Sequence, residues 1–426
     1  MKEWRVLVFP GGTEIGLEIQ KALSPCKEVR LFSAGMNVPN HAPYVFLRHF
    51  VLPSVHERGW LEALIAVVRR EGIDFIFPAY DDVLLALAEN ANRIPATVVT
   101  SPLETCRITR SKSATYRFLE GVVPVPRMYP DADSVDAFPV FVKPDRGQGS
   151  QRAALVPSKA ELAELVKAQS DLIILENLPG EEYTVDCFSD RERGLLFCGA
   201  RQRIRTNRGI AWNSRPVRDP AFDALARGIA GRLEFHGVWF FQAKRAADGV
   251  LTLLEIAPRV AGTMALHRVM GVNFPLLSLY EQARVPVTIM ANEIDVELER
   301  ALLNRYRHDL RYGAVFVDLD DTLLCHGVVN RDLVKLVFQC INAGVRTVLL
   351  TRHAGDLNAL LAKHRLAGLW DEIIAVDKDR KKSEFITRRD AILVDDSFSE
   401  RADVQRRCGI PTFDSSMIEM LFDDRA

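Results

Sequence analysis

Residues 239–244 read WFFQAK and residues 253–259 read LLEIAPR, and these two apolar runs identify the central part of the chain as a sheet. Each run has the length and composition of a strand, and turn-forming residues separate them. Adjacent antiparallel strands bring facing side chains together. The pattern therefore predicts that Gln242 and Glu255 lie side by side, with Arg259 directly behind them.

The residues before these strands form a second polar series. Lys112 precedes a helix, and Lys143 ends the strand-like run FVKP. A loop with Gly147, Gly149 and Ser150 follows, and its glycines let backbone N–H groups fold over a polyphosphate. Two lysines and such a loop indicate ATP. For this stretch alone, a solvated Lys143 before a plain hairpin turn is an equal alternative.

A hinge-like segment comes next along the chain. The strand Ile173–Glu176 leads through Asn177 and Leu178 to Glu182 and a further strand. In this layout, backbone atoms of the hinge can hold an adenine ring. The carboxylate of Glu182 can accept hydrogen bonds from ribose hydroxyls.

The alternation of strand-like and helical runs divides the chain into three segments. The pattern predicts a small Rossmann-like parallel α/β unit in residues 1–105 and an α+β domain rich in hairpins in residues 106–300. It predicts a third α/β domain in residues 301–426. A charged helical piece, Glu293–Asp309, is expected to connect the last two. The predicted fold class is therefore multidomain α/β.

Glycines and acids mark two strand ends in the first segment. Gly11, Gly12 and Gly16 follow a strand and open a helix, where backbone N–H groups can hold an anion. A tight strand-to-helix turn explains these glycines equally well. Asp81 follows another strand, so it either lies at the edge where open α/β sheets bind ligands or caps the next helix.

In this order, the motifs of the first 300 residues resemble those of an ATP-grasp enzyme. The resemblance implies that Lys112 and Lys143 hold the phosphates, that Ser150 and its glycines form a lid, that Glu176, Asn177 and Leu178 form the adenine hinge, and that Glu182 binds ribose. It also implies that Glu255 is a magnesium ligand and that Arg259 stabilises the transferring phosphoryl group.

Two positions depart from the ATP-grasp pattern. Gln242 stands where that family has an acidic metal ligand, and Ala257 stands where an asparagine is expected. Magnesium is a hard cation that prefers charged oxygen, so one of two metal positions is in doubt. The run LEIAPRVAGTM also resembles ATP-grasp proteins encoded with tellurium-resistance biosynthetic genes, which indicates no substrate.

The chemistry implied by this resemblance joins an acid to an amine. A substrate carboxylate attacks the γ-phosphate of ATP, and an amine then displaces phosphate from the acyl phosphate. Arg201, Arg203 and Arg205 alternate along a strand and share a face, so they are candidates for holding a substrate carboxylate or phosphate. A solvated sheet face is an equal alternative. Asp81 is a further substrate-binding candidate.

The third segment opens with a buried strand that runs into acids. Residues 315–323 read VFVDLDDTL and place Asp318 and Asp320 just beyond an apolar run. Capping acids at a strand-to-helix junction are the simpler explanation. Carboxylates crowded at the end of an apolar strand repel each other, however, and a bound cation would relieve that repulsion.

Further polar residues follow in the order typical of haloacid-dehalogenase-type phosphatases, which the segment resembles. Thr351 ends a strand, Lys381 and Lys382 precede a helix, and Asp395 and Asp396 end another strand. The resemblance implies that Asp318 is the nucleophile, that Asp320 is the acid and base, and that Thr351 donates a hydrogen bond to the phosphate. It also implies that Lys381 or Lys382 neutralises charge. The candidate magnesium ligands are Asp318, Asp320, Asp395 and Asp396. The intervals between these motifs are too short for a cap domain, so a capless Rossmannoid domain is expected.

Composition limits the partners. The chain has 426 residues, 55 Lys plus Arg against 56 Asp plus Glu, and a formal net charge of −1, which gives no footprint for nucleic acid. No apolar run is long enough for a membrane span, and we expect a cytoplasmic protein. The seven cysteines contain no CxxC pair, so neither a disulfide framework nor a zinc site is indicated.

These observations predict a bifunctional enzyme. One part would be an ATP- and magnesium-dependent carboxylate–amine ligase, and the other a phosphatase acting on a related phosphorylated metabolite. Two alternatives stay open: an ATP-grasp kinase that phosphorylates a hydroxyl, or a nucleotide-sensing module that regulates an active phosphatase. A homodimer is possible, although the sequence does not settle the oligomeric state.

Overall fold

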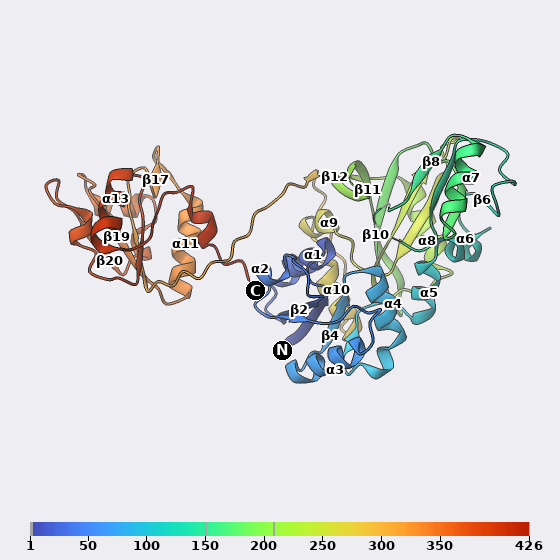
Figure 1. The fold of residues 1–426 in the computed structure, drawn as a ribbon, viewed down its shortest axis with the longest axis horizontal. Coiled ribbons are helices and arrows are strands. Elements are labelled where there is room, and N and C mark those ends of the chain that lie inside the picture. Colours follow the sequence, from blue (N-terminus) through green and yellow to red (C-terminus); the bar gives the residue numbers. More distant parts are fainter. Residues whose placement is uncertain (1–2, 148, 150, 208, 426) are drawn as a thin grey trace. The chain divides into compact units, whose positions relative to one another are not determined.

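The computed structural model describes residues 3–147, 149, 151–207 and 209–425. The chain forms two compact units, one built by Met1–Leu302 and one by Leu303–Asp424. Figure 1 shows the first unit in blue to yellow and the second in orange to red. The first unit contains both of the first two predicted segments, and the boundary between them at residue 105 stays a prediction.

A five-stranded parallel sheet begins the first unit. Its order is β3-β2-β1-β4-β5, so the strand order reverses between β1 and β4. Its strands and main helices are β1 (Trp4–Phe9), β2 (Val29–Gly35), β3 (His49–Val51), β4 (Phe75–Pro78), β5 (Thr97–Val98), α1 (Glu14–Leu23), α2 (Ala42–Val45), α3 (Trp60–Glu71) and α4 (Asp81–Glu89). The four residues of β4 are all buried, as expected for a parallel strand covered on both faces.

A four-stranded antiparallel sheet follows, in the order β6-β9-β7-β8. Its strands and neighbouring helices are β6 (Met128–Tyr129), β7 (Val140–Pro144), β8 (Ala154–Val156), β9 (Leu172–Glu176), α5 (Leu103–Arg110), α6 (Lys112–Leu119) and α7 (Lys159–Ala168). Figure 1 shows α7 lying along this sheet. The pairing of β7 with β9 places Lys143 opposite Ile173, whereas Glu176, where the hinge begins, pairs with Val140 at the other end of β7.

The largest sheet of the unit has six antiparallel strands in the order β14-β13-β10-β11-β12-β15. Its elements are β10 (Glu182–Asp190), β11 (Gly194–Asn207), β12 (Ile210–Val217), β13 (Gly237–Arg245), β14 (Leu251–Ala257), β15 (Leu298–Glu299), α8 (Pro220–Ala230), α9 (Ala265–Val269) and α10 (Phe274–Gln282). No helix is described in Glu293–Asp309, so the expected helical connector is wrong: this stretch supplies β15, whose backbone bonds to β12 instead of closing helical turns.

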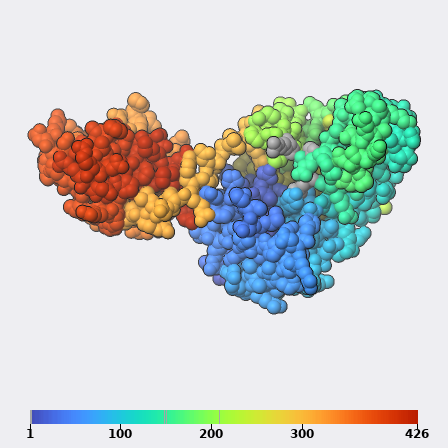
Figure 2. All heavy atoms as spheres, in the orientation of Figure 1, coloured from blue at the N-terminus to red at the C-terminus, as the bar shows by residue number. Residues whose placement is uncertain are grey.

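Strand β13 serves two hydrophobic cores at once. Trp239 and Phe241 point into the core beneath α8, whereas Phe240 points into the core that also contains Val6, Val8 and other residues of the first sheet. Successive strand residues face opposite sides of a sheet, so one aromatic run can fill both cores. This shared packing joins the two sheets within the first unit, whose surface is drawn in blue to yellow in Figure 2.

The second unit is built on a parallel sheet in the order β20-β19-β16-β21-β22. Its elements are β16 (Ala314–Val317), β17 (Leu324–Cys325), β18 (Val328–Val329), β19 (Arg346–Thr351), β20 (Glu372–Ala375), β21 (Ala391–Val394), β22 (Thr412–Phe413), α11 (Arg331–Asn342), α12 (Leu357–Lys363) and α13 (Phe398–Cys408). Strands β16 and β21 are neighbours and are fully buried. Asp318 and Asp395 follow these two strands, so both acids start from the same sheet edge.

Among the described residues, no helix is both long and apolar enough to cross a membrane.

Candidate functional site

A cleft in the first unit lies between the four-stranded and six-stranded sheets. It is lined by ten of the residues predicted to bind nucleotide or metal: Lys112, Lys143, Gly147, Gly149, Glu176, Asn177, Leu178, Glu182, Gln242 and Glu255. Strand β7 and the end of β9 supply one wall, and β10, β13 and β14 supply the other. Ser150 lies outside the described residues.

Lys143 is held at the base of this cleft by two oxygen acceptors. Its Nζ donates to the Tyr116 hydroxyl at 2.9 Å and to the Leu254 carbonyl at 3.1 Å. Burial lowers the pKa of Lys143 to about 8, although the Glu255 carboxylate favours the charged form. Sequence reasoning missed Tyr116, whose only signal is its place one helical turn after Lys112. The Lys112 Nζ donates to the Gly147 carbonyl at 3.1 Å and so holds the start of the glycine loop.

Gln242 and Glu255 face each other across β13 and β14, as the strand pattern predicts. Two other carboxylates line the described part of the cleft: Glu182 lies 2.8 Å from Nε of Arg203, and Glu176 accepts a hydrogen bond from the Arg127 amide at 2.8 Å. A divalent ion bound by this part of the chain would take one free carboxylate, from Glu255, and the amide oxygen of Gln242. This donor set fits a hard cation whose remaining ligands are phosphate oxygens and water.

Arg259 and Asp81 form an ion pair beside the cleft. Nε of Arg259 donates to Asp81 Oδ1, and its Nη1 donates to the Val260 carbonyl at 3.0 Å. Although burial opposes ionisation, the Arg259 guanidinium holds the pKa of Asp81 below its ordinary value. Lys112 and Glu255 line the same small pocket. Helix α4 begins at Asp81 without a side-chain capping bond, so the alternative of a helix cap is wrong.

The three alternating arginines of β11 do not act alike. Arg201 is buried, and its guanidinium donates to both Asp186 oxygens at 2.8 and 3.1 Å. His267 Nδ1 lies 2.9 Å from the same carboxylate. The prediction that Arg201 binds substrate is therefore wrong, because Asp186, from the neighbouring strand, already accepts two of its hydrogen bonds. Arg203 pairs with Glu182, which lines the cleft.

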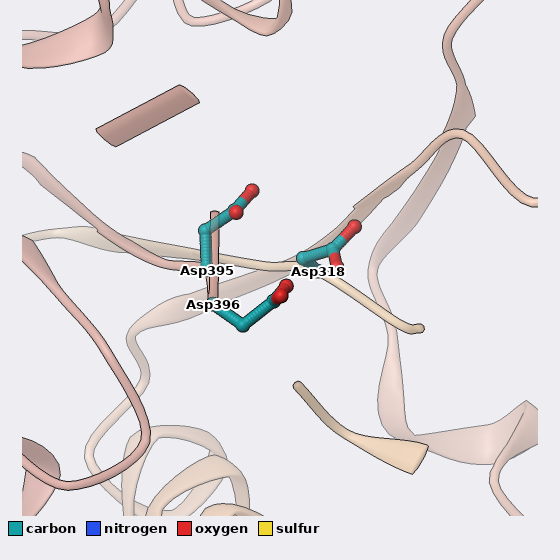
Figure 3. Close-up of side chains that lie close together, drawn as sticks. All are labelled: Asp318, Asp395 and Asp396. Atoms are coloured by element: carbon teal, nitrogen blue, oxygen red, sulfur yellow. The ribbon is translucent and has the colours of Figure 1, made fainter. Parts of the chain in front are cut away.

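A second site lies in the unit built by Leu303–Asp424. One oxygen each from Asp318, Asp395 and Asp396 lie within 4.8 Å of one another. Figure 3 shows the three side chains grouped at two neighbouring strand ends. Lys382 Nζ donates to Asp318 Oδ1 and to Asp395 Oδ2, both at 2.6 Å. Three carboxylates around one point are a donor set that fits a hard divalent cation.

Burial and neighbouring charges shift the pKa of Asp318 in this second site, and the Thr322 hydroxyl connects two of its carboxylates. Burial raises the pKa of Asp318 to about 6, Lys382 opposes that rise, and Asp395 adds to it. The Thr322 hydroxyl lies 3.2 Å from Asp318 Oδ2 and 3.0 Å from Asp396 Oδ1. Thr322 was not among the predicted site residues, although it is the threonine of the DxDxT pattern.

Asp320 lies differently from the expectation. Asp320 is exposed and outside the carboxylate group, because the chain turns at Asp321, which has a positive φ of 59°. Its oxygens lie 3.1 Å from Nδ1 of His353, a residue that sequence reasoning missed. A metal-ligand role for the Asp320 side chain is therefore wrong. Thr351 is buried at the end of β19, and its Oγ1 accepts a hydrogen bond from the His353 amide at 3.1 Å.

The two adjacent lysines are separated by the structure. Lys382 is 3% exposed and reaches the carboxylates, whereas the side chain of Lys381 is exposed. Consecutive residues at the start of a short helical turn point in different directions, so only one of them can face the site. A role for Lys381 as the neutralising cation is therefore wrong.

Comparisons with known proteins support the ATP-grasp assignment. A family model described as "ATP-grasp in the biosynthetic pathway with Ter operon" matches residues 168–300. No curated protein sequence matches the chain. Among solved structures, a biotin carboxylase complex with β-γ-ATP from Campylobacter jejuni is similar, with a TM-score of 0.56 and 14% identity over 67% of this chain and 72% of that chain.

Two further structures have the same fold. An L-amino acid ligase from Bacillus licheniformis has a TM-score of 0.55 and 17% identity, covering 68% of this chain and 76% of that chain. The ADP complex of purK, an N5-carboxyaminoimidazole ribonucleotide synthetase, has a TM-score of 0.57 and 16% identity, covering 70% and 80%. The chain therefore has a mixed α/β fold with ATP-grasp architecture, which confirms that part of the prediction.

Proposed function

We propose that the first unit is an ATP-dependent carboxylate–amine ligase that releases ADP and phosphate. The observation that carries this proposal is the convergence of Lys112, Lys143 and Glu255 on one cleft, with Arg259 beside it. The likeness in fold to a biotin carboxylase in complex with β-γ-ATP, to an L-amino acid ligase and to a synthetase in complex with ADP supports the same function. The two lysines supply fixed positive charge where a nucleotide polyphosphate would lie.

Each residue of the cleft has a role in this proposal. The hinge formed by Glu176, Asn177 and Leu178 would hold adenine, and Glu182, positioned by Arg203, would hold the ribose. Glu255 and Gln242 would hold Mg²⁺, which supplies charge neutralisation on the phosphates. Lys112 and Lys143 orient the β- and γ-phosphates, and positioning of this kind is most of what phosphoryl transfer requires.

The reaction has two steps with balanced charges. An oxygen of the substrate carboxylate attacks the γ-phosphorus, and the bond to ADP breaks as the acyl phosphate forms. The nitrogen of an amine then attacks the acyl carbon, phosphate leaves, and the amine loses a proton. Arg259 lies beside the metal carboxylate and would hold the negative charge that develops on the transferred group.

The ligase proposal is tested by product analysis. The full chain is incubated with ATP, Mg²⁺ and mixtures of acids and amines, and the nucleotide products are separated. We expect ADP, with release lost in Lys143→Met and kept in Lys167→Met, a lysine of α7 that lies outside the cleft. AMP as the sole product would refute the proposal. ADP release that continues without the amine and leaves a stable phosphorylated product would instead show a kinase.

We further propose that the second unit is a capless phosphatase of the haloacid-dehalogenase type. Asp318 would attack the phosphorus of a phosphate monoester, and the alcohol would leave with a proton from Asp320, which His353 holds in place. Lys382 and a Mg²⁺ ion held by Asp318, Asp395 and Asp396 would neutralise the phosphate. Thr351 would donate a hydrogen bond to it. Water activated by Asp320 would then cleave the aspartyl phosphate.

This second proposal has a separate assay. Hydrolysis of p-nitrophenyl phosphate in Mg²⁺ is compared between the unchanged chain, Asp318→Asn and Asp332→Asn, an exposed aspartate of α11. We expect the first variant to lose activity and the second to keep it. Equal activity in all three would refute the assignment of Asp318. If Asp318→Asn also stopped ADP release, the two activities would be coupled.

A further inference from the structure

A second cavity in the first unit lies apart from the nucleotide cleft. It has a volume of about 370 Å³ and opens where the strand order of the parallel sheet reverses. Phe9, at the end of β1, Gly35, at the end of β2, and Tyr80, just after β4, line it. In open α/β sheets, ligands bind at this crevice beyond the carboxyl ends of the strands. The volume falls within the range of about 300 to 1,000 Å³ that is typical of small-molecule sites.

The lining of this cavity is mostly apolar. Its apolar side chains are those of Phe9, Pro10, Met36, Val38, Pro53, Val55 and Val83. No lysine or arginine is among the described residues that line it, and the imidazole of the lining residue His56 lies 3.6 Å from the Asp82 carboxylate. An anionic group placed here would lose its water without gaining a cationic partner, which is costly. The cavity therefore favours an uncharged group over a carboxylate or a phosphate.

Two polar side chains of the wall, Tyr80 and Asp82, lie at the start of helix α4. Burial, together with the nearby carboxylates of Asp82 and Asp81, raises the pKa of Tyr80, so its hydroxyl keeps its proton and can donate a hydrogen bond. Asp82 already accepts a hydrogen bond from Nε of Arg110 at 3.0 Å, which neutralises its charge. Tyr80 thus supplies a neutral donor and Asp82 a paired acid, and the other polar lining residues are Thr13, Asn40, Ser54 and His56.

Helix α4 also connects the cavity to the candidate active site. Asp82 and Val83 line the cavity, whereas Asp81 pairs with Arg259 in the neighbouring pocket. Arg110 lines that pocket too, while its guanidinium reaches Asp82. A ligand in the cavity would therefore lie against the same helical turn that positions Arg259.

We propose that this cavity binds an uncharged aromatic or aliphatic group, and that this group is the non-reacting part of a ligase substrate. The binding part of the inference stands on the cavity alone, whereas the substrate part rests on the proposed ligase function. The place of the cavity at the sheet edge indicates a ligand site, and its apolar wall indicates an uncharged ligand.

The binding part is tested with indole as a probe, by calorimetric titration of the full chain. Val38 lines the cavity and is 52% exposed, so Val38→Trp should fill the cavity without disturbing the core. Val51, on edge strand β3 and 60% exposed, does not line the cavity, and Val51→Trp is the matched control. We expect saturable binding to the unchanged chain and to Val51→Trp, and affinity about tenfold weaker in Val38→Trp.

A second probe tests the chemical class. Indole-3-acetate carries the same ring with a carboxylate and should bind about tenfold more weakly than indole, because no lysine or arginine among the described lining residues would pair with its charge. Absence of saturable indole binding, unchanged affinity in Val38→Trp, or equal affinity for the two probes would each overturn the proposal.

The substrate part is tested by ADP release with L-phenylalanine or L-glutamate as the acid, each with a mixture of amines. We expect faster release with phenylalanine, and a loss of that preference in Val38→Trp but not in Val51→Trp. Release with glutamate alone would overturn the substrate class. Release with neither acid would overturn the substrate class and, if no other acid gave ADP, the ligase proposal too, while the indole result would still decide the binding site.

Discussion

Under the proposed ligase function, the low pKa of Lys143 should make nucleotide binding depend on pH. Burial lowers this pKa to about 8, so the free amine loses its proton within a range that is easy to measure. Phosphate groups beside the amine favour its charged form and would return the pKa towards that of an ordinary lysine, about 10.4. Binding above pH 8 therefore requires the uptake of a proton.

The expected size of the effect follows from the pKa. Between pH 7 and pH 9 the charged fraction of free Lys143 falls from about nine-tenths to about one-tenth. The apparent dissociation constant of ADP should then rise about tenfold, which corresponds to ~1.4 kcal/mol. Over this range, binding is strongest below the pKa, where the lysine already carries its charge, and it weakens as the pH rises through 8.

Calorimetric titration with ADP at fixed Mg²⁺ measures this dependence. Repeating the titration in buffers with different ionisation enthalpies gives the number of protons taken up, which should approach one at pH 9. Arginine stays charged throughout this range, so Lys143→Arg should bind ADP with a flat pH profile. A dissociation constant of the unchanged protein that varied less than about twofold between pH 7 and 9 would refute this account of Lys143.

Three further predictions concern charge and packing. Lys382→Met should abolish p-nitrophenyl phosphate hydrolysis and Lys381→Met should preserve it, because only Lys382 contacts the carboxylates; equal losses would contradict this. Arg201→Met leaves buried Asp186 without its main cation and should lower the free energy of unfolding by about 3 to 5 kcal/mol in urea, whereas exposed Arg205→Met should cost under about 1 kcal/mol. Trp239→Ala should cost about 3 to 5 kcal/mol by the same measurement, since it removes a fully buried ring; a smaller loss would mean that the core collapses around it.

Local patterns in the sequence were enough to locate most of the nucleotide cleft. Lys143 ends an apolar strand, and Glu255 lies within another, so each position could be assigned from periodicity alone. The same reasoning placed Asp318 and Asp395 after two buried strands, and parallel strands present their carboxyl ends at one edge. The order of these motifs along the chain then indicated the ATP-grasp fold.

Tertiary structure alone decided which charged side chains meet. Arg201 and Arg203 occupy equivalent places in the alternation, yet Arg201 meets Asp186 in the core and Arg203 meets Glu182, which lines the cleft. Strand periodicity assigns a side chain to a face of the sheet, but the partner on that face comes from another strand or helix. The choice of Lys382 over Lys381, and the cavity beside Val38, likewise depend on backbone turns and on packing between distant segments, which no local pattern encodes.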